Sequence, residues 1–491
     1  FGDLILFCVK LFEEHQDIRS IYQNNFKYIL VDEFQDTNFI QNKWLNLLVN
    51  DKQNICCVGD DDQSIYSWRG AEIRNFLTFD QIYKNCKVFK LEQNYRSTKN
   101  ILETASTLIS NNSNRVEKKL WSSANQGELV KLNCYRTGKE EAQGVSDIIE
   151  NKLKKKYSLN DVSILVRAIY QTREFEERFL QIGIGYRVLG GTKFYERAEI
   201  KDAVSYLRII NQKYDDLALE RVIGSPKRGV GESTLNQIYQ FGKKNNLCLE
   251  DSIVKILEND DFKPRIKTAL AQLVKMIMKW RQVALRMKHF DLLKIVLDES
   301  GYSAMLKNKK DLENENRLEN LKELLRAMQD YDNLQSFLEH VALATSIDQE
   351  WEGAKINLMT MHGAKGLEFD VVFLPGWEEG LFPHQKSLEE KGDFALEEER
   401  RLAYVGITRA KKEAYLSFAM KRAYHGDWMD ALPSRFINEI PDDSVEKNEI
   451  NIDKSIDDFE FNQDNSIEFD EEYRSPGWDR YKKNKMLKWK K

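Results

Sequence analysis

The stretch that decides the fold is Tyr28-Ile-Leu-Val-Asp-Glu-Phe-Gln-Asp-Thr37. Its first four residues are apolar, and the two acids Asp32 and Glu33 follow directly. The stretch Ile55-Cys-Cys-Val58 repeats this pattern and runs into Asp60-Asp-Asp-Gln63. Parallel strands of α/β proteins are apolar throughout and deliver polar side chains at their carboxyl ends, where ligands bind. We therefore predict buried parallel strands alternating with helices in this part of the chain.

Length and composition exclude several classes of protein. The chain has 491 residues, of which 42% are hydrophobic, so it is long enough for about three folded domains. No run of about 18 uncharged apolar residues occurs, which excludes a membrane-spanning helix. Six cysteines without a CxxC motif favour free, buried thiols, and we expect a cytoplasmic protein. The six histidines form no HExxH motif, which excludes a zinc protease of that type.

Charge is unevenly distributed along the chain. The net charge is −5, but residues 442–472 carry 13 Asp/Glu against two lysines, which leaves +6 for the rest. We predict an acidic linker there. The tail that follows, Arg480–Lys491, holds seven Lys/Arg interleaved with aromatic residues. Such a tail can contact phosphates or acidic proteins, and a disordered solubilising end explains it equally well.

Further apolar runs and periodic segments predict more α/β structure around a helical block. Residues 195–348 contain amphipathic stretches such as Leu318–Met328, whose leucines recur with the period of a helix. This block interrupts the α/β pattern, which resumes at 355–418. The predicted strands on either side are Val88–Leu91, Val130–Asn133, Val162–Val166, Ile356–Met359, Val371–Leu374 and Ala414–Ser417.

Asp32 and Glu33 fit the chemistry of nucleotide hydrolysis. The first carboxylate can hold Mg²⁺, and the second can orient and deprotonate the water that attacks a γ-phosphate. Many α/β proteins end a strand with two acids, so this pair alone is weak evidence for nucleotide hydrolysis. Arg409, after Gly-Ile-Thr, can neutralise charge on a transferring phosphoryl group. The nearby Glu399-Arg-Arg401 is equally compatible with a solvated helix face.

A second group of residues suits unpaired nucleic-acid bases. Tyr66, Trp68 and Arg69 follow the acidic turn and offer two aromatic faces and a guanidinium, although aromatic residues in a loop also serve as core anchors. The turn Thr360-Met-His-Gly-Ala-Lys-Gly366 can bring backbone N–H groups close to phosphates. A satisfied turn histidine explains His362 equally well.

Five motifs in order make a family recognisable. They are Val31-Asp-Glu-Phe-Gln-Asp-Thr37, Val58-Gly-Asp-Asp-Asp-Gln-Ser-Ile-Tyr-Ser-Trp-Arg-Gly-Ala71, Gln93-Asn-Tyr-Arg-Ser97, His362-Gly-Ala-Lys-Gly-Leu-Glu-Phe369 and Tyr404-Val-Gly-Ile-Thr-Arg-Ala410. Together they resemble motifs II to VI of the UvrD/Rep/PcrA family of superfamily 1 DNA helicases. The resemblance covers about residues 1–441.

This resemblance implies an α/β fold of two RecA-like P-loop NTPase motor domains, parallel sheets with flanking helices, and an inserted, mainly helical subdomain. It also implies ATP and Mg²⁺ as cofactors, single-stranded DNA and single/double-strand junctions as partners, and 3′-to-5′ movement in DNA repair or replication. The implied domains are 1–87 (part of 1A with a remnant of 1B), 88–190 (2A, first part), 191–350 (2B), 351–441 (2A, second part) and 442–491 (acidic linker and basic tail, disordered).

The motifs also assign expected roles to single residues. Asp32 resembles the Mg²⁺ ligand, Glu33 the water-activating base and Gln63 the γ-phosphate sensor. Tyr95 would stack on adenine and Glu368 would bind the ribose. The remaining roles are contact with the γ-phosphate by Arg96 and Arg409, and contact with the DNA strand by Tyr66, Trp68, Arg69, Thr360 and His362.

A loop in the inserted subdomain is a candidate for duplex contact. Pro226-Lys-Arg-Gly-Val-Gly-Glu-Ser-Thr234 places Lys227 and Arg228 and a Gly-x-Gly turn before a helix start. Such a turn can present N–H groups to a phosphate backbone. A plain helix-capping loop is the competing interpretation.

The sequence departs from the family at one motif. A P-loop requires G-x-x-x-x-G-K-[ST], and neither Gly138-Lys139 nor Gly242-Lys243 completes it. Since the chain also begins with Phe1 rather than methionine, we expect an amino-terminally truncated helicase that hydrolyses ATP negligibly on its own.

Two other functions remain open at this stage. One is a non-catalytic remnant that binds single-stranded DNA or a repair protein through its 2A/2B portion and basic tail. An in-frame P-loop upstream of Phe1 would argue against it. The other is a helicase–nuclease, which the dispersed acids of 442–472 disfavour. The sequence does not distinguish the UvrD, Rep and PcrA branches, the oligomeric state or the preferred DNA structure.

Overall fold

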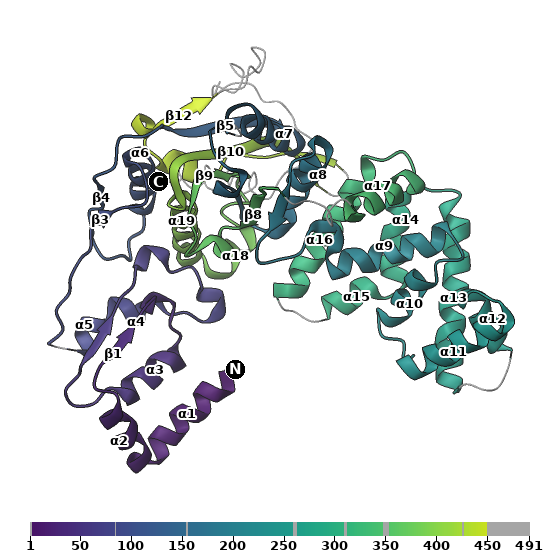
Figure 1. Ribbon diagram of the computed structural model, residues 1–491, viewed down its shortest axis with the longest axis horizontal. Coiled ribbons are helices and arrows are strands. Elements are labelled where there is room, and N and C mark those ends of the chain that lie inside the picture. Colours follow the sequence, from purple (N-terminus) through teal and green to yellow (C-terminus); the bar gives the residue numbers. More distant parts are fainter. Residues whose placement is uncertain are drawn as a thin grey trace, which may run out of the picture. The chain divides into compact units, whose positions relative to one another are not determined.

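The computed structural model describes residues 2–83, 85–153, 156–258, 263–308, 312–346, 353–424 and 427–448 (Figure 1). The chain divides into two compact units. The first contains the described residues of Phe1–Arg167, Ile356–Arg422 and Asp430–Lys491, and the second contains those of Ala168–Lys355 and Ala423–Met429. The predicted basic tail lies outside the described residues, and the predicted domain boundaries stay predictions.

The first unit is built on a parallel sheet. Within it the described strands run in the order β12-β5-β10-β9-β6-β8, and every neighbouring pair is parallel. Five of these strands contain predicted ones, because uninterrupted apolar runs are buried on both faces of a parallel sheet. The bounds are β5 Val130–Thr137, β6 Val162–Val166, β8 Ile356–Thr360, β9 Phe369–Leu374, β10 Ala410–Tyr424 and β12 Val445–Asn448.

Helices flank this sheet, so the fold class predicted from the sequence is confirmed. The helices α7 and α19 pack against β5 and β9 respectively, and α6 packs against α19. The strand β12 was not predicted: residues 445–448 pair in register with Val130–Asn133, where an acidic linker is expected. The helices are α6 Lys99–Ile109, α7 Gly138–Ile148, α18 Gln385–Lys391 and α19 Asp393–Ile407.

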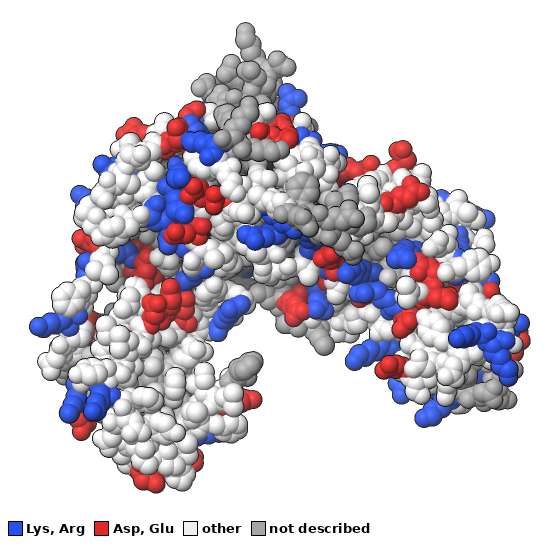
Figure 2. Space-filling model, viewed as in Figure 1, with Lys and Arg blue, Asp and Glu red and all other residues white. Residues whose placement is uncertain are grey.

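Residues 2–83 form a smaller α/β layer, in which the described strands are one pair, β1 Ile29–Val31 and β2 Ile55–Cys57. They are parallel, as predicted, but the prediction that they are buried is wrong. Leu30 is 80% exposed, and Cys56 beside it in the ladder is exposed too. In Figure 2 the part that contains β1 is largely uncharged. The helices are α1 Gly2–Glu14, α2 Gln16–Asn25, α3 Phe39–Leu48, α4 Ile73–Leu77 and α5 Phe79–Ile82.

Two further sequence predictions are wrong, that the thiols are buried and that Val88–Leu91 is a strand. The six thiols are free, but Cys8 and Cys56 are exposed and the other four are half-buried. Cys56 is exposed because β2 leaves one face uncovered. Val88–Leu91 is not a strand: Phe89 is 80% exposed and pairs with no neighbour among the described residues. The next strand along the chain after β2 is β3, Gln93–Asn94, which is parallel to β4, Trp121–Ser122.

The second unit is helical, as predicted for 195–348. Its core is a continuous apolar cluster around the fully buried Trp280 and Tyr206. In the predicted amphipathic stretch, Leu321, Leu324 and Met328 face this core from α16. The elements are α8 Thr172–Ile182, β7 Tyr186–Val188, α9 Ala198–Asn211, α10 Asp216–Gly224, α11 Glu232–Asn245, α12 Leu249–Leu257, α13 Pro264–Ala284, α14 His289–Glu299, α15 Tyr302–Lys307, α16 Leu312–Gln329 and α17 Leu334–Ser346. The strand β11 covers Asp427–Asp430.

None of the described helices is both long and apolar enough to cross a membrane.

Candidate functional site

The acidic motif stands at the carboxyl end of β1, as predicted. Oδ1 of Asp32 accepts a hydrogen bond from the backbone N–H of Glu33 at 2.9 Å. Glu33 has φ of +50°, a left-handed conformation that turns the chain sharply after the strand. Its Oε2 accepts a 2.6 Å hydrogen bond from Nε2 of the buried Gln35. Both carboxylates are exposed. The buried Gln35 fixes the position of the Glu33 carboxylate.

Gln63 is tied to the same turn through Asp60. Nε2 of Gln63 donates to Oδ2 of Asp60 at 2.6 Å, and the backbone N–H of Asp60 donates to Oε1 of Gln35 at 3.0 Å. Gln35 thus bridges Glu33 and Asp60. Hydrogen bonds through Gln35 and Asp60 thus connect the predicted base, in the turn after β1, to the predicted sensor, in the turn after β2.

Tyr95 and Arg96, which follow β3, lie near Glu368, which precedes β9 in the same unit. Nε of Arg96 donates to Oε2 of Glu368 at 2.8 Å, and this contact lowers the pKa of Glu368. Tyr95 is 81% exposed, and its hydroxyl donates to Gln93 on β3 at 2.8 Å. An exposed ring beside a paired carboxylate and guanidinium is compatible with the expected contacts to adenine and ribose.

Arg409 is buried next to these residues. Its guanidinium donates to the backbone oxygens of Val405 at 3.0 Å and Leu367 at 3.3 Å. Burial lowers the pKa of Arg409 to about 10, and the positive charge of Arg96 acts in the same direction. Asp60 and Glu33 oppose this shift, which places both acids within electrostatic reach of Arg409. The predicted phosphate-binding residues therefore share one neighbourhood.

The residues predicted to touch DNA form a second cluster. The guanidinium of Arg69 lies 4.5 Å from the ring centroid of Trp68 and 5.2 Å from that of Tyr66. Both rings also approach His362, with centroids 6.3 and 6.5 Å away, and the Tyr66 hydroxyl donates to the His362 backbone oxygen at 3.2 Å. Thr360 stabilises this turn by accepting from the backbone N–H of Gly363 at 3.1 Å. Trp68, 48% exposed, offers a face to a base.

His362 is held neutral in this cluster. Burial lowers its pKa to about 3, and the nearby Arg167 acts in the same direction. Arg167 is in turn paired with Glu399, whose Oε1 lies 2.6 Å from a guanidinium nitrogen. Burial would raise the pKa of Glu399, but Arg167 and the backbone N–H of His384 together offset the effect and the pKa is lowered. Glu399 thus lies in a buried ion pair and not on a solvated helix face.

Lys365 connects the two clusters. Its Nζ lies 2.5 Å from Oδ2 of Asp36, 2.8 Å from the backbone oxygen of Gln63 and 3.5 Å from Oε2 of Glu33. It also lies 5.2 Å from the ring centroid of Tyr66. The sequence suggested that the turn of Lys365 binds phosphates, whereas the structure turns its side chain towards the acidic motif.

The loop of Lys227 and Arg228 lies in the second unit. Arg228 donates to the backbone oxygens of Val222 and Pro226 and, at 2.9 Å, to the hydroxyl of Tyr206. These contacts occupy its guanidinium at the end of α10, whereas the helix that follows the loop, α11, begins after Gly231. The duplex-contact and helix-capping interpretations of this loop both stay predictions. Lys227 is exposed.

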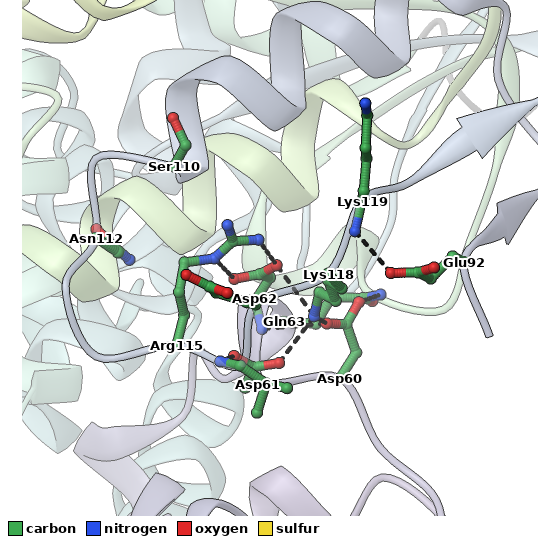
Figure 3. Close-up of polar contacts among 12 residues, drawn as sticks. Asp60, Asp61, Asp62, Gln63, Glu92, Ser110, Asn112, Arg115, Lys118 and Lys119 are labelled. Carbon is green, nitrogen blue, oxygen red and sulfur yellow. Dashed lines mark hydrogen bonds and ion pairs between the residues drawn. The ribbon is translucent and has the colours of Figure 1, made fainter. Parts of the chain in front are cut away.

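Sequence reasoning missed the partners of the acidic turn. Arg115 and Lys118 precede β4 and bind Asp60, Asp61 and Asp62 (Figure 3). Three consecutive carboxylates that lie close together need positive charge nearby, which was a usable signal. The sequence did not say which of the chain's 74 Lys/Arg would supply it.

The residues present fit a nucleotide and Mg²⁺ in part. Asp32 offers an exposed carboxylate of the kind that Mg²⁺ accepts alongside phosphates and water. Arg96 and Gln63 have side chains of the kind that bind a γ-phosphate, whereas the guanidinium of the buried Arg409 donates to the backbone oxygens of Val405 and Leu367. The 491 residues contain no P-loop to hold the β-phosphate, so the chain supplies part of such a site.

Comparisons with known proteins assign the chain to a family. Residues 89–421 match the UvrD-like helicase C-terminal domain and residues 1–84 match the UvrD/REP helicase N-terminal domain. The chain is 45% identical over 446 residues to DNA helicase II of Rickettsia typhi, covering 90% of this chain and 68% of that protein. It is 43% identical over 467 residues to the ATP-dependent DNA helicase PcrA of Bacillus subtilis, covering 91% and 62%. The chain thus spans about two thirds of the length of these relatives, and it belongs to the UvrD-like family of DNA helicases.

Proposed function

We propose that this chain binds single-stranded DNA and supplies part of the ATP site of a 3′-to-5′ DNA translocase that acts in repair or replication. The supporting observation is the contact of Lys365 with both clusters. The DNA cluster (Tyr66, Trp68, Arg69 and His362) and the acidic motif are joined through one buried ammonium group, as coupling between DNA binding and hydrolysis requires.

In this function the aromatic residues bind bases and the acidic turn prepares a water molecule. Trp68 stacks on a base while Arg69, held over both rings, meets the phosphate backbone. Glu33 orients and deprotonates the attacking water, with Gln63 and Arg409 at the γ-phosphate. Asp32 would hold Mg²⁺, which would neutralise the charge that develops on the phosphoryl oxygens. Lys227 would contact the duplex at a junction.

DNA binding by the 491-residue chain tests the first half of the proposal. Anisotropy of a fluorescent oligothymidylate should rise with added protein, and Trp68→Ala should weaken binding by about 1–3 kcal/mol, or roughly 5- to 150-fold. Trp121→Ala is the matched control, because Trp121 is 51% exposed and lies outside the DNA cluster. Equal loss in both variants, or no binding by the unaltered chain, would overturn the proposed DNA site.

ATP hydrolysis tests whether the ATP site of this chain is complete. We expect negligible DNA-stimulated turnover from this chain alone, because no P-loop holds the β- and γ-phosphates. Robust turnover that is lost in Glu33→Gln would show that the site is complete without a P-loop. The alternative is a function limited to binding DNA or a partner. It predicts unchanged DNA binding in Glu33→Gln. It also predicts negligible ATP turnover.

A further inference from the structure

Three consecutive aspartates surround one lysine ammonium in the first unit. Nζ of Lys118 lies 2.8 Å from Oδ1 of Asp61 and 3.0 Å from Oδ2 of Asp62, and it also contacts Oδ1 of Asp60. Figure 3 shows the three carboxylates converging on this nitrogen. The contacts are well shielded, since the side chain of Lys118 is 14% exposed and those of Asp61 and Asp62 are 2% and 1% exposed.

Without a cation these carboxylates would repel one another. One oxygen from each lies within 4.8 Å of the others, a spacing suited to a single divalent ion. Arg115 neutralises Asp62 with two parallel hydrogen bonds, at 3.0 and 2.7 Å. Among the described residues, the ion pairs of Asp60 and Asp61 are made with Lys118. Burial alone would lower the pKa of Lys118, but the three carboxylates overcome this effect and raise it, so the ammonium stays charged.

The cluster controls the orientation of Gln63 through Asp60. One carboxylate oxygen of Asp60 is held by Lys118, and the other accepts the 2.6 Å hydrogen bond from Nε2 of Gln63. The first oxygen also accepts from the backbone N–H of Asp62 at 3.1 Å, at the start of the short turn that ends in Gln63. Rotation of the Asp60 carboxylate would therefore move the amide of Gln63.

Lys118 itself is anchored to the strand pair that precedes Tyr95 and Arg96. The backbone N–H of the next residue, Lys119, donates to Oε1 of Glu92 at 2.8 Å, and that of Trp121 donates to the Glu92 backbone oxygen at 2.9 Å. From there β4 pairs with β3, which leads directly into the predicted adenine and phosphate residues. One side chain thus joins the strand before Tyr95 to the turn of Gln63.

We propose that Lys118 is a tethered counter-ion that takes the place of a divalent cation among Asp60, Asp61 and Asp62 and thereby positions Gln63. It is a positioning residue, because it acts through Asp60. The proposal rests on the proposed function only for the role of Gln63 at a nucleotide.

Metal binding tests the counter-ion. Free Mn²⁺ is measured by electron paramagnetic resonance with the 491-residue chain. We expect Lys118→Met to bind about one Mn²⁺ more than the unaltered chain, and Mn²⁺ to raise its unfolding midpoint above the value in EDTA. Lys118→Arg keeps the cation and should gain none. Lys119→Met is the matched control, since its ammonium points away from the cluster (Figure 3), and it should gain none.

Nuclear magnetic resonance tests the positioning of Gln63. With ¹⁵N-glutamine labelling, the side-chain amide signal of Gln63 is identified by its loss in Gln63→Leu. It should shift in Lys118→Met and also in Asp60→Asn, a milder variant that keeps Lys118 paired, and it should stay in place in Lys119→Met. An unshifted signal in Lys118→Met and Asp60→Asn, or no gain of Mn²⁺ in a folded Lys118→Met chain, would overturn the proposal. Neither readout uses DNA or ATP, so a failed DNA-binding experiment leaves both tests intact.

Discussion

Nζ of Lys365 lies 2.5 Å from Oδ2 of Asp36, although 329 positions separate the two residues in the chain. The lysine side chain is 7% exposed and the aspartate 20%. Burial raises the pKa of Asp36, and Lys365 counteracts this effect without reversing it. The pair therefore links the turn after β1 to the turn after β8 at a position where water screens charge poorly. Loss of the pair should lower the free energy of unfolding.

A double-mutant cycle measures this coupling. Lys365→Met and Asp36→Asn, singly and combined, should show an interaction free energy of about 1–3 kcal/mol in urea unfolding, because the groups are in direct contact and largely buried. The matched cycle uses Lys412→Met and Asp370→Asn, where the lysine is 55% exposed, and should give about 0–0.5 kcal/mol. Equal values in the two cycles would contradict the assigned role of burial.

His362 should make stability sensitive to acid. Its folded pKa of about 3 lies below the ordinary value of 6.5, so the unfolded chain binds more protons between these values. The stabilisation is complete above pH 6.5 and falls as pH is lowered, by up to about 1.4 kcal/mol per unit. His362→Gln should flatten the decline in unfolding midpoint between pH 6.5 and 5. The exposed His15→Gln is the control, and an unaltered slope in His362→Gln would refute the assignment.

The salt dependence of DNA binding should separate Arg69 from His362. A cation that meets a phosphate of single-stranded DNA contributes about 0.7 to the slope of log K against log salt. Arg69→Gln should reduce the slope by about this amount. His362→Gln should weaken binding without altering the slope, since its ring is neutral near pH 7. Anisotropy titrations from 50 to about 300 mM KCl give both values, with the exposed Lys52→Gln as control. A slope lowered equally by both variants would show a charged His362.

Arg400 should be a stabilising residue. It donates to both oxygens of Glu439, at 2.7 and 2.9 Å, and to Asn112 at 2.5 Å, with 6% of its side chain exposed. Arg400→Met leaves a partly buried carboxylate without its partner and should cost about 3–5 kcal/mol in urea unfolding. Lys447→Met removes an exposed partner of Asp442 and should change stability by less than about 0.5 kcal/mol. An effect as small as that of Lys447→Met would contradict a stabilising role for the Arg400–Glu439 pair.

The fold was predictable wherever a strand has neighbours on both sides. Val162–Val166 and Val371–Leu374 are apolar runs, and the structure buries both in the middle of the parallel sheet. Tyr28–Val31 has the same pattern, yet Leu30 is largely exposed. An apolar run indicates that a strand is suited to burial between neighbouring strands and helices. It does not indicate whether the described residues provide those strands and helices.

The site was predictable as a set of residue types but not as a set of contacts. Tyr66 and His362 were both assigned to DNA, whereas their direct contact across 296 positions depends on how two segments pack. Arg409 was expected to be available to a phosphate, and the structure shows its donors on backbone oxygens of Val405 and Leu367. Ion pairs such as Lys118 with Asp61 involve residues 57 positions apart, and a charge pattern along the chain does not encode such pairs.

The narrow ladder of β1 and β2 has a consequence for hydrogen exchange. Two strands of three residues, exposed on one face, are held by few contacts and open with little cost. Backbone amides of Leu30 and Cys56 should therefore exchange with deuterium well before those of Ile164 and Val372, which lie fully buried in the large sheet. The turn of Asp32 and Glu33 is thus carried by one of the most easily opened parts of its unit, and ligands that bind there would also slow the exchange of the strand beneath them.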